Sequence, residues 1–132
     1  AEDLHRLAVE LCISGRYARA LSVLALATGR TDDPDLRARI EGTRALALQR
    51  TGSPSEAEEV LREALAARGL TAHTRAILRG QLGALAMYGG RLDEAERLFG
   101  EAVEALDDTD PLAAARVRMN RSLGRMQRRD LE

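Results

Sequence analysis

The chain has 132 residues, which is the length of one domain with a sizeable buried core. Hydrophobic residues make up 45% of the sequence and aromatic residues only 2%, which excludes a disordered chain and predicts a core of Leu, Ala and Val. A core of this kind favours packed helices over a β-sandwich. The net charge of −1 gives no general attraction to nucleic acid or to anionic membranes.

The sequence also indicates where the protein comes from and where it works. All 20 basic residues are arginine, which is typical of a bacterial genome with a high GC content. Cys12 is the single cysteine, so no disulfide can form within the chain and a cytoplasmic location is expected. No signal peptide and no run of about 18 apolar residues is found, so neither export nor a membrane span is expected. The chain does not begin with methionine, and we expect it to be part of a longer protein.

Seven segments with helical periodicity follow one another, and none shows the alternation of a β-strand. Three of them begin with proline after Asp33, Ser53 and Asp110, whose side chains can accept hydrogen bonds from the free N–H groups of the first turn. Ser53 and Glu56 also fit a capping box, and glycines supply helix ends. The sequence therefore predicts an all-α protein with helices over residues 2–14, 17–28, 34–51, 54–68, 71–88, 92–107 and 111–130.

A repeat becomes visible when the turn glycines Gly15, Gly52 and Gly90 are used as anchors. The anchors lie 37 and 38 residues apart, and the residues five, nine and twelve positions after each are small, large and small. These residues are Ala20, Leu24 and Ala27, then Ala57, Leu61 and Ala64, then Ala95, Phe99 and Ala102. A small residue, Ala8, Ala45 or Gly83, also stands seven positions before each anchor. A fourth anchor falls at Arg129, with Ser122 at the corresponding small position.

The repeat spacing has a physical explanation. Two antiparallel helices joined by a tight turn approach closely only where one side lacks bulk, so the small residues mark the crossing of each pair. One pair cannot bury its apolar face alone, and stacked pairs form a solenoid. We therefore expect one domain over residues 1–132, with repeats over about 1–33, 34–70 and 71–109 and a partial repeat over 110–132, which makes three pairs and one further helix.

At these residues the chain resembles the tetratricopeptide repeat family. The marks of the resemblance are Leu82-Gly83, Tyr17 and the Ala95, Phe99, Ala102 triad. The early tryptophan of that family is missing, since Leu4, Glu41 and Arg79 stand at its place. The resemblance implies a right-handed α-solenoid whose concave groove binds proteins. A weaker resemblance is to the tetratricopeptide-rich N-terminal regions of actinobacterial CHAT-domain proteins.

The residues give no sign of an enzyme. His5 and Cys12 share a helix face but are seven residues apart, about 10 Å along the axis, which is too far for a nucleophile and its base. His73 begins another helix, and two histidines with one cysteine in separate places do not make a metal site. Gly80 and Gly83 follow no strand and precede no Lys-Ser/Thr, so they are not a phosphate loop. We expect no enzymatic activity, no cofactor and no metal.

The resemblance implies instead a partner-binding groove along the first helix of each pair. Mapped by the anchors, the groove residues are His5, Val9, Cys12, Arg39, Gly42, Leu46, Gln49, Gly80, Ala84, Met87, Met119, Leu123 and Met126. The alternative for each is packing against a neighbouring helix. Lysine is absent, so a lysine-based clamp for an acidic C-terminus is not expected. The expected function is an interaction or sensor module that binds a peptide or a helix of a protein partner, and neither nucleic acid nor membrane is an expected partner.

The last predicted helix adds an alternative function. It carries six arginines, whereas residues 93–110 carry eight acidic residues and one arginine, so mutual compensation of neighbouring helices is expected. The helix has no partner to complete a pair, and we expect Val117 and Leu131 to lack part of their cover. The alternative is therefore a self-association element that forms homo-oligomers of a larger multidomain protein through this C-terminal helix.

Overall fold

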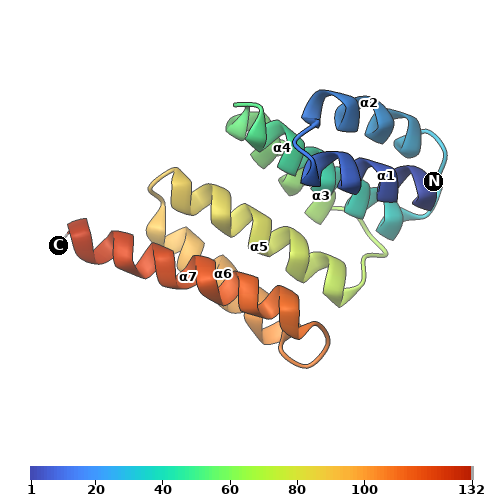
Figure 1. The fold of residues 1–132 in the computed structure, drawn as a ribbon. Coiled ribbons are helices and arrows are strands. Elements are labelled where there is room, and N and C mark those ends of the chain that lie inside the picture. Colours follow the sequence, from blue (N-terminus) through green and yellow to red (C-terminus); the bar gives the residue numbers. More distant parts are fainter. Residues whose placement is uncertain (132) are drawn as a thin grey trace. The chain divides into compact units, whose positions relative to one another are not determined.

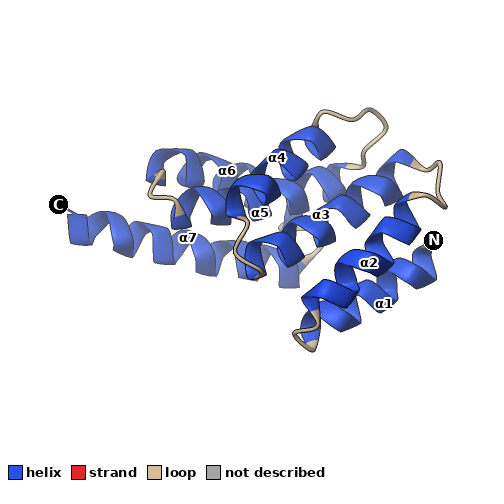
Figure 2. Ribbon diagram, turned by 90° about the horizontal axis from the view of Figure 1, so that it is seen from above, coloured by secondary structure: helices blue, strands red, loops and turns tan. Residues whose placement is uncertain are grey.

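A computed structural model describes residues 1–131, and within them it contains helices and loops but no strand (Figure 2). The all-α prediction is confirmed. The seven helices are α1 (Glu2–Ile13), α2 (Tyr17–Thr28), α3 (Pro34–Arg50), α4 (Pro54–Leu65), α5 (Ala72–Tyr88), α6 (Leu92–Leu106) and α7 (Pro111–Leu131). Six of them match the predicted segments to within one residue at each end. The exception is α4, whose last turn tightens through a bond from the Ala67 N–H to the Ala64 carbonyl (3.2 Å), so the helix ends before residue 68.

The chain forms two compact units. The first, Ala1–Leu70, contains α1 to α4, and the second begins at Thr71 and contains α5 to α7. Within each unit every helix packs antiparallel against the next one in sequence (Figure 1). The odd-numbered helices also meet inside each unit, because α1 contacts α3 and α5 contacts α7.

The same tight turn joins the two helices of each pair. Its glycine, Gly15, Gly52 or Gly90, has a φ of +78°, +89° or +81°. In each turn the glycine N–H bonds to the carbonyl three residues earlier, and the next N–H bonds to the carbonyl five residues earlier at 2.8–2.9 Å. Glycine adopts positive φ without the strain that a Cβ would add. The turn geometry therefore explains why the repeat is anchored on glycine.

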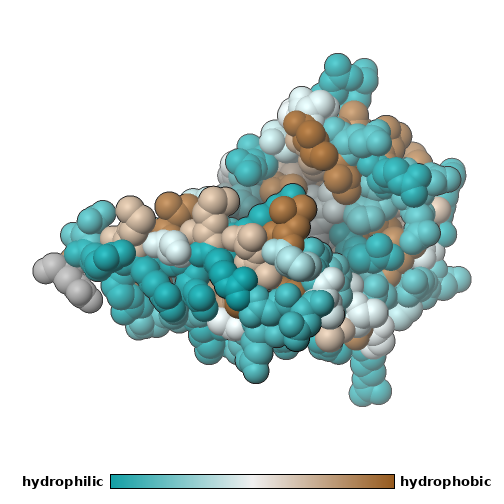
Figure 3. All heavy atoms as spheres, turned by 60° about the horizontal axis from the view of Figure 1, so that its bottom comes forward, coloured by the Kyte–Doolittle hydropathy of each residue, from teal (hydrophilic) through white to brown (hydrophobic). Residues whose placement is uncertain are grey.

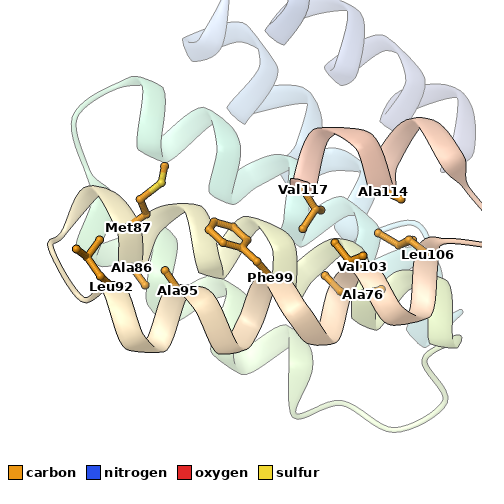
Figure 4. Close-up of a cluster of buried hydrophobic side chains, with 11 residues drawn as sticks. Ala76, Ala86, Met87, Leu92, Ala95, Phe99, Val103, Leu106, Ala114 and Val117 are labelled. Carbon is orange, nitrogen blue, oxygen red and sulfur yellow. The ribbon is translucent and has the colours of Figure 1, made fainter. Parts of the chain in front are cut away.

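The small and large residues of the repeat form the buried face of each second helix. Each of the nine residues from Ala20 to Ala102 at the repeated spacings is at most 8% exposed. In the second unit, Phe99 points from α6 toward α5 (Figure 4), where a Cβ built on Gly83 would lie 2.7 Å from its ring. A side chain at position 83 has no room, which confirms that the small residue marks a close helix crossing.

Two of the three predicted side-chain caps form. Asp33 Oδ1 accepts from the Asp35 N–H at 3.0 Å, and Asp110 Oδ1 accepts from the Ala113 N–H at 3.1 Å. Ser53 makes no capping bond, so the capping box prediction is wrong. Ser53 directly follows the turn glycine, which holds its ψ at 60°, whereas Asp33 has the extended ψ of 114° that capping residues favour.

The prediction for the exposed end of the chain is correct for Leu131 and wrong for Val117. Leu131 is 75% exposed, but Val117 is only 7% exposed. Val117 Cγ2 lies 3.1 Å from the position that a Cβ on Gly80 would occupy. Because Gly80 of α5 has no side chain, it leaves room for the side chain of Val117. Figure 4 shows Val117 on the same apolar cluster as Val103 of α6.

Candidate partner-binding surface

His5 of α1 forms a hydrogen bond with Thr43 of α3. His5 Nε2 is 2.8 Å from Thr43 Oγ1, and the Thr43 hydroxyl donates to the Arg39 carbonyl at 3.3 Å. A His5 ring protonated at Nε2 donates to the Thr43 hydroxyl oxygen, and a ring protonated at Nδ1 accepts from the hydroxyl at Nε2. Burial and the Arg39 guanidinium lower the pKa of His5, against a smaller opposing effect of Glu2. The fold thus favours a neutral His5, whose hydrogen bond joins two odd-numbered helices.

Arg39 lies between two carboxylates in the same cluster. Its Nη2 is 3.5 Å from Glu2 Oε1, and its Nε is 3.5 Å from Asp35 Oδ2. With His5 neutral, the cluster holds one positive and two negative groups. This charge balance disfavours an acidic ligand at the surface that α1 and α3 form.

Cys12 is part of the core of the first unit. It is 6% exposed and packs in a cluster with Ala20 and Ala47, with the half-buried Leu46 against them. Burial raises the pKa of the Cys12 thiol, which keeps it protonated and poorly reactive at neutral pH. Cys12 is therefore a packing residue in this structure.

Three groups of predicted groove residues occupy equivalent positions, counted back from the turn anchors. The residues ten positions before an anchor are His5, Gly42, Gly80 and Met119. Those six positions before are Val9, Leu46, Ala84 and Leu123, and those three positions before are Cys12, Gln49, Met87 and Met126. Gly42, Gly80, Cys12 and Met87 are buried, whereas all four residues of the second group are half-buried or exposed. We call Val9, Leu46, Ala84 and Leu123 the exposed repeat positions.

Burial of Gly80 and Met87 comes from α7. Val117 fills the space above Gly80, as described above. Met87 is 2% exposed, and its Sδ lies 3.4 Å from the position of a Cβ on Gly124. Gln127 Nε2 also donates to the Met87 carbonyl at 3.5 Å. These two residues of α5 therefore support a helix contact.

The outward face of α7 is apolar and open to solvent. Met119 is 61% exposed, Leu123 47% and Met126 54%, and Leu112 near the start of the helix is 67% exposed. Figure 3 shows tan and brown side chains in a row along α7, next to a band of hydrophilic ones. Among the predicted groove residues, Met119, Leu123 and Met126 are the large apolar side chains with the highest exposed fraction.

The arginines on the flank of α7 pair with acids of the preceding segment. The ion pairs are Arg118–Asp107, Arg125–Glu96 and Arg128–Asp93. They confirm the expected compensation between the acidic segment 93–110 and the last helix for these three arginines. The exposed apolar side chains of α7 therefore lie beside a flank of the same helix on which three arginines are paired with acidic side chains.

One polar contact of the second unit was not expected from the sequence. His73 Nε2 lies 2.9 Å from Asp110 Oδ2, while Asp110 Oδ1 caps α7. Hydrogen bonds from His73 and from the Ala113 N–H lower the pKa of Asp110. His73 and Asp110 stand 37 residues apart, close to the repeat period, and that spacing is the signal that could have paired them.

Features that would indicate small-molecule chemistry are few in residues 1–131. No group of three or more His, Cys, Asp or Glu side chains there could hold a metal ion. The space between α6 and α7 lined by Phe99, Gly124 and Arg125 has a volume of about 10 Å³, which is enough for one water. No helix in this part of the chain is long and apolar enough to cross a membrane. Comparison with protein-family models and with curated proteins finds no match to this chain.

Proposed function

We propose that this chain is a protein-interaction module that binds a peptide or a helix of a partner on the outward faces of its odd-numbered helices. The observation that carries the proposal is the distribution of exposed apolar side chains. In residues 1–131, the exposed large hydrophobic residues lie on α1, α5 and α7 except for Leu26 of α2, and α3 exposes none. The others are Leu7, Val9, Ile13, Tyr88, Leu112, Met119, Leu123, Met126 and Leu131. On α7 they form a continuous row, and an exposed apolar patch of this kind is typical of surfaces that bind other proteins.

We further propose that the helix pairs are tetratricopeptide-like repeats that build a right-handed solenoid. The repeated glycine turn supports this proposal, because the same hydrogen bonds close it at Gly15, Gly52 and Gly90. The buried small residues at equal spacing support it as well. Within each unit the exposed repeat positions lie on two helices that contact each other, Val9 and Leu46 on α1 and α3 and Ala84 and Leu123 on α5 and α7.

Leu46 offers the sharpest test of the proposed binding face in the first unit. Peptides that bind the wild-type chain are selected from a random-peptide display library, and one is synthesised for affinity measurement. Leu46→Arg is expected to weaken its binding by about 10-fold or more, because the added charge would be buried unpaired under the ligand. The chain should stay folded with a modestly lower melting temperature, because Leu46 is only half-buried against the cluster of Cys12, Ala20 and Ala47 and the aliphatic part of an arginine can keep some of that contact.

Two controls separate binding from folding. Ser55→Arg places the same charge on an exposed position of α4, away from the odd-numbered helices, and should leave affinity unchanged. Ala57→Arg, at a fully buried crossing position, should unfold the first unit. If Leu46→Arg unfolds the chain, or if Ser55→Arg weakens binding as much as Leu46→Arg does, the proposed face is wrong.

A further inference from the structure

The outward face of α7 carries the spacing of a coiled-coil seam. Its residues recur at alternating intervals of four and three, which is the a/d pattern of a heptad repeat. The six residues are Leu112, Arg116, Met119, Leu123, Met126 and Asp130. All six are exposed, and the four apolar ones are 47–67% exposed. The opposite face of α7 packs into its own unit through Ala114 and Val117.

Arg116 and Asp130, the two charged residues of the seam, determine which kind of partner can bind it. Within residues 1–131 neither Arg116 nor Asp130 has an oppositely charged side chain within 4 Å, and Arg116 attracts the Asp110 carboxylate only at longer range. Both stand seven positions from Leu123, one on each side. A helix with acidic flanks would satisfy Arg116 but would repel Asp130. A second copy of α7 satisfies both, provided that it runs in the opposite direction.

We propose that two copies of this chain associate through an antiparallel pairing of their α7 helices. Met119, Leu123 and Met126 form the apolar centre, and Arg116 of each copy lies within one helical turn of Asp130 of the other copy. A parallel pairing would instead place Arg116 against Arg116, which is unfavourable. Polar residues at seam positions specify helix orientation in this way.

The size of the seam sets the expected strength of the dimer. From Leu112 to Asp130 the seam is about 27 Å long, from the 1.5 Å rise per residue. One helix face of this length buries less than a standard stable interface, so a dissociation constant of the order of 100 µM is expected. This pairing goes beyond the proposed function, because a chain that remained monomeric could still bind a peptide through Val9 and Leu46.

Sedimentation equilibrium of the 132-residue chain over a range of about 5 to 500 µM tests the pairing. The wild type is expected to shift from monomer to dimer within this range. Leu123→Glu should weaken association by about 10-fold or more, because two carboxylates would be brought together in an apolar seam. Ser55→Glu is the matched control, since it replaces an exposed residue by the same charge on another helix, α4, and should leave the dimer in place. Circular dichroism checks that both variants keep the helix content of the wild type.

Charge reversal tests the orientation. Arg116→Asp and Asp130→Arg should each weaken the dimer by about 3- to 10-fold, and the double variant should regain most of the wild-type affinity. A wild type that stays monomeric at the highest concentration would overturn the proposal. So would a dimer that tolerates Leu123→Glu, or a double variant that is no tighter than the single ones.

Discussion

Gly83 shows how a single missing side chain determines the packing of two helices. A Cβ built on it would lie 2.7 and 2.8 Å from ring carbons of Phe99 and 3.3 Å from the Leu98 Cβ. Such distances require the ring or the backbone to move. Gly100 in the middle of α6 is the opposite case, because no atom lies within 4 Å of its Cβ position. The two glycines therefore have different reasons to be present.

The same substitution at these two positions should have effects of opposite sign. Gly83→Ala forces Phe99 out of its place, and overpacking of this kind typically costs about 1–3 kcal/mol, more than the helix propensity that alanine gains. Gly100→Ala keeps that gain without a clash and should stabilise the protein by up to about 1 kcal/mol. Urea unfolding of both variants measures the difference. If Gly83→Ala stabilises the protein, the Phe99 side chain can move more easily than its exposed fraction of 1% indicates.

At the scale of the element, α7 is held in two different ways along its length. Its buried residues, Ala114 and Val117, both lie in the first half of the helix. The second half is held to α5 and α6 mainly by polar contacts, which include the ion pairs of Arg125 and Arg128 and the hydrogen bond from Gln127. The first half is therefore attached by apolar packing and the second half largely by electrostatics.

This division predicts a salt effect that is confined to one half of α7. Between about 0.1 and 1 M NaCl the Debye length falls from about 10 to 3 Å, so the exposed ion pairs weaken while the apolar packing does not. Amide hydrogen exchange over residues 121–131 should become several-fold faster, and exchange over residues 111–117 should change little. The measurement is best made on Leu123→Glu, so that association of two chains does not protect the helix.

A double variant provides the control for the salt effect. Asp93→Asn with Glu96→Gln removes the acidic partners of Arg128 and Arg125. It should exchange rapidly over residues 121–131 at low salt and should no longer respond to added salt. If exchange over this segment is insensitive to salt in both proteins, the ion pairs do not hold the helix.

At the scale of the whole molecule, acid should weaken the two units in different pH ranges. In the first unit the pKa of His5 is lowered, so the fold favours the neutral imidazole. The contribution of His5 to the free energy of unfolding is therefore lost as the pH falls below about 6.5, the pKa of histidine in an unfolded chain. In the second unit the pKa of Asp110 is lowered, so the fold favours the charged carboxylate. Its contribution is present above about pH 4 and is lost as pH falls further.

Melting curves at a series of pH values test this expectation. The melting temperature of the wild type should begin to fall as the pH drops below about 6.5 and should fall again below about pH 4. His5→Gln keeps a side chain that can donate to or accept from Thr43 but does not titrate, so it should remove the first decline. Asp110→Asn should remove much of the second. A first decline that persists in His5→Gln would show that another group titrates on unfolding.

Most of the fold could be predicted from the sequence because the decisive signals are local. A turn closed by Gly15 within five residues, and a proline after Asp33, need no knowledge of distant parts of the chain. Equal spacing of small residues such as Ala20 and Ala57 then indicates which helices cross. The capping prediction failed at Ser53 because the glycine turn, a second local signal, overrides it. Thr71, whose side chain caps α5, was missed because no proline follows it.

The candidate binding surface was less predictable because equivalent residues have different neighbours. Met87 and Met126 occupy the same repeat position, yet Met87 is 2% exposed and Met126 is 54% exposed. The difference is that α7 covers Met87, and no described helix covers Met126 in the same way. Gly80 and Met119 differ for the same reason. The exposure of a residue at a repeat position therefore depends on which helix packs against it. The residues of the repeat itself do not carry that information.

The uneven cover of the methionines also has a consequence for oxidation chemistry. Peroxide adds oxygen to an accessible thioether and turns a flexible apolar side chain into a polar sulfoxide. Of the three methionines, Met119 and Met126 expose their side chains on α7, whereas Met87 is enclosed between helices. Oxidising conditions would therefore convert the apolar row of α7 into a polar one before they reach the core. The reductases that repair methionine sulfoxide could restore it, which would make the outward face of α7 responsive to oxidative stress while the rest of the fold stays intact.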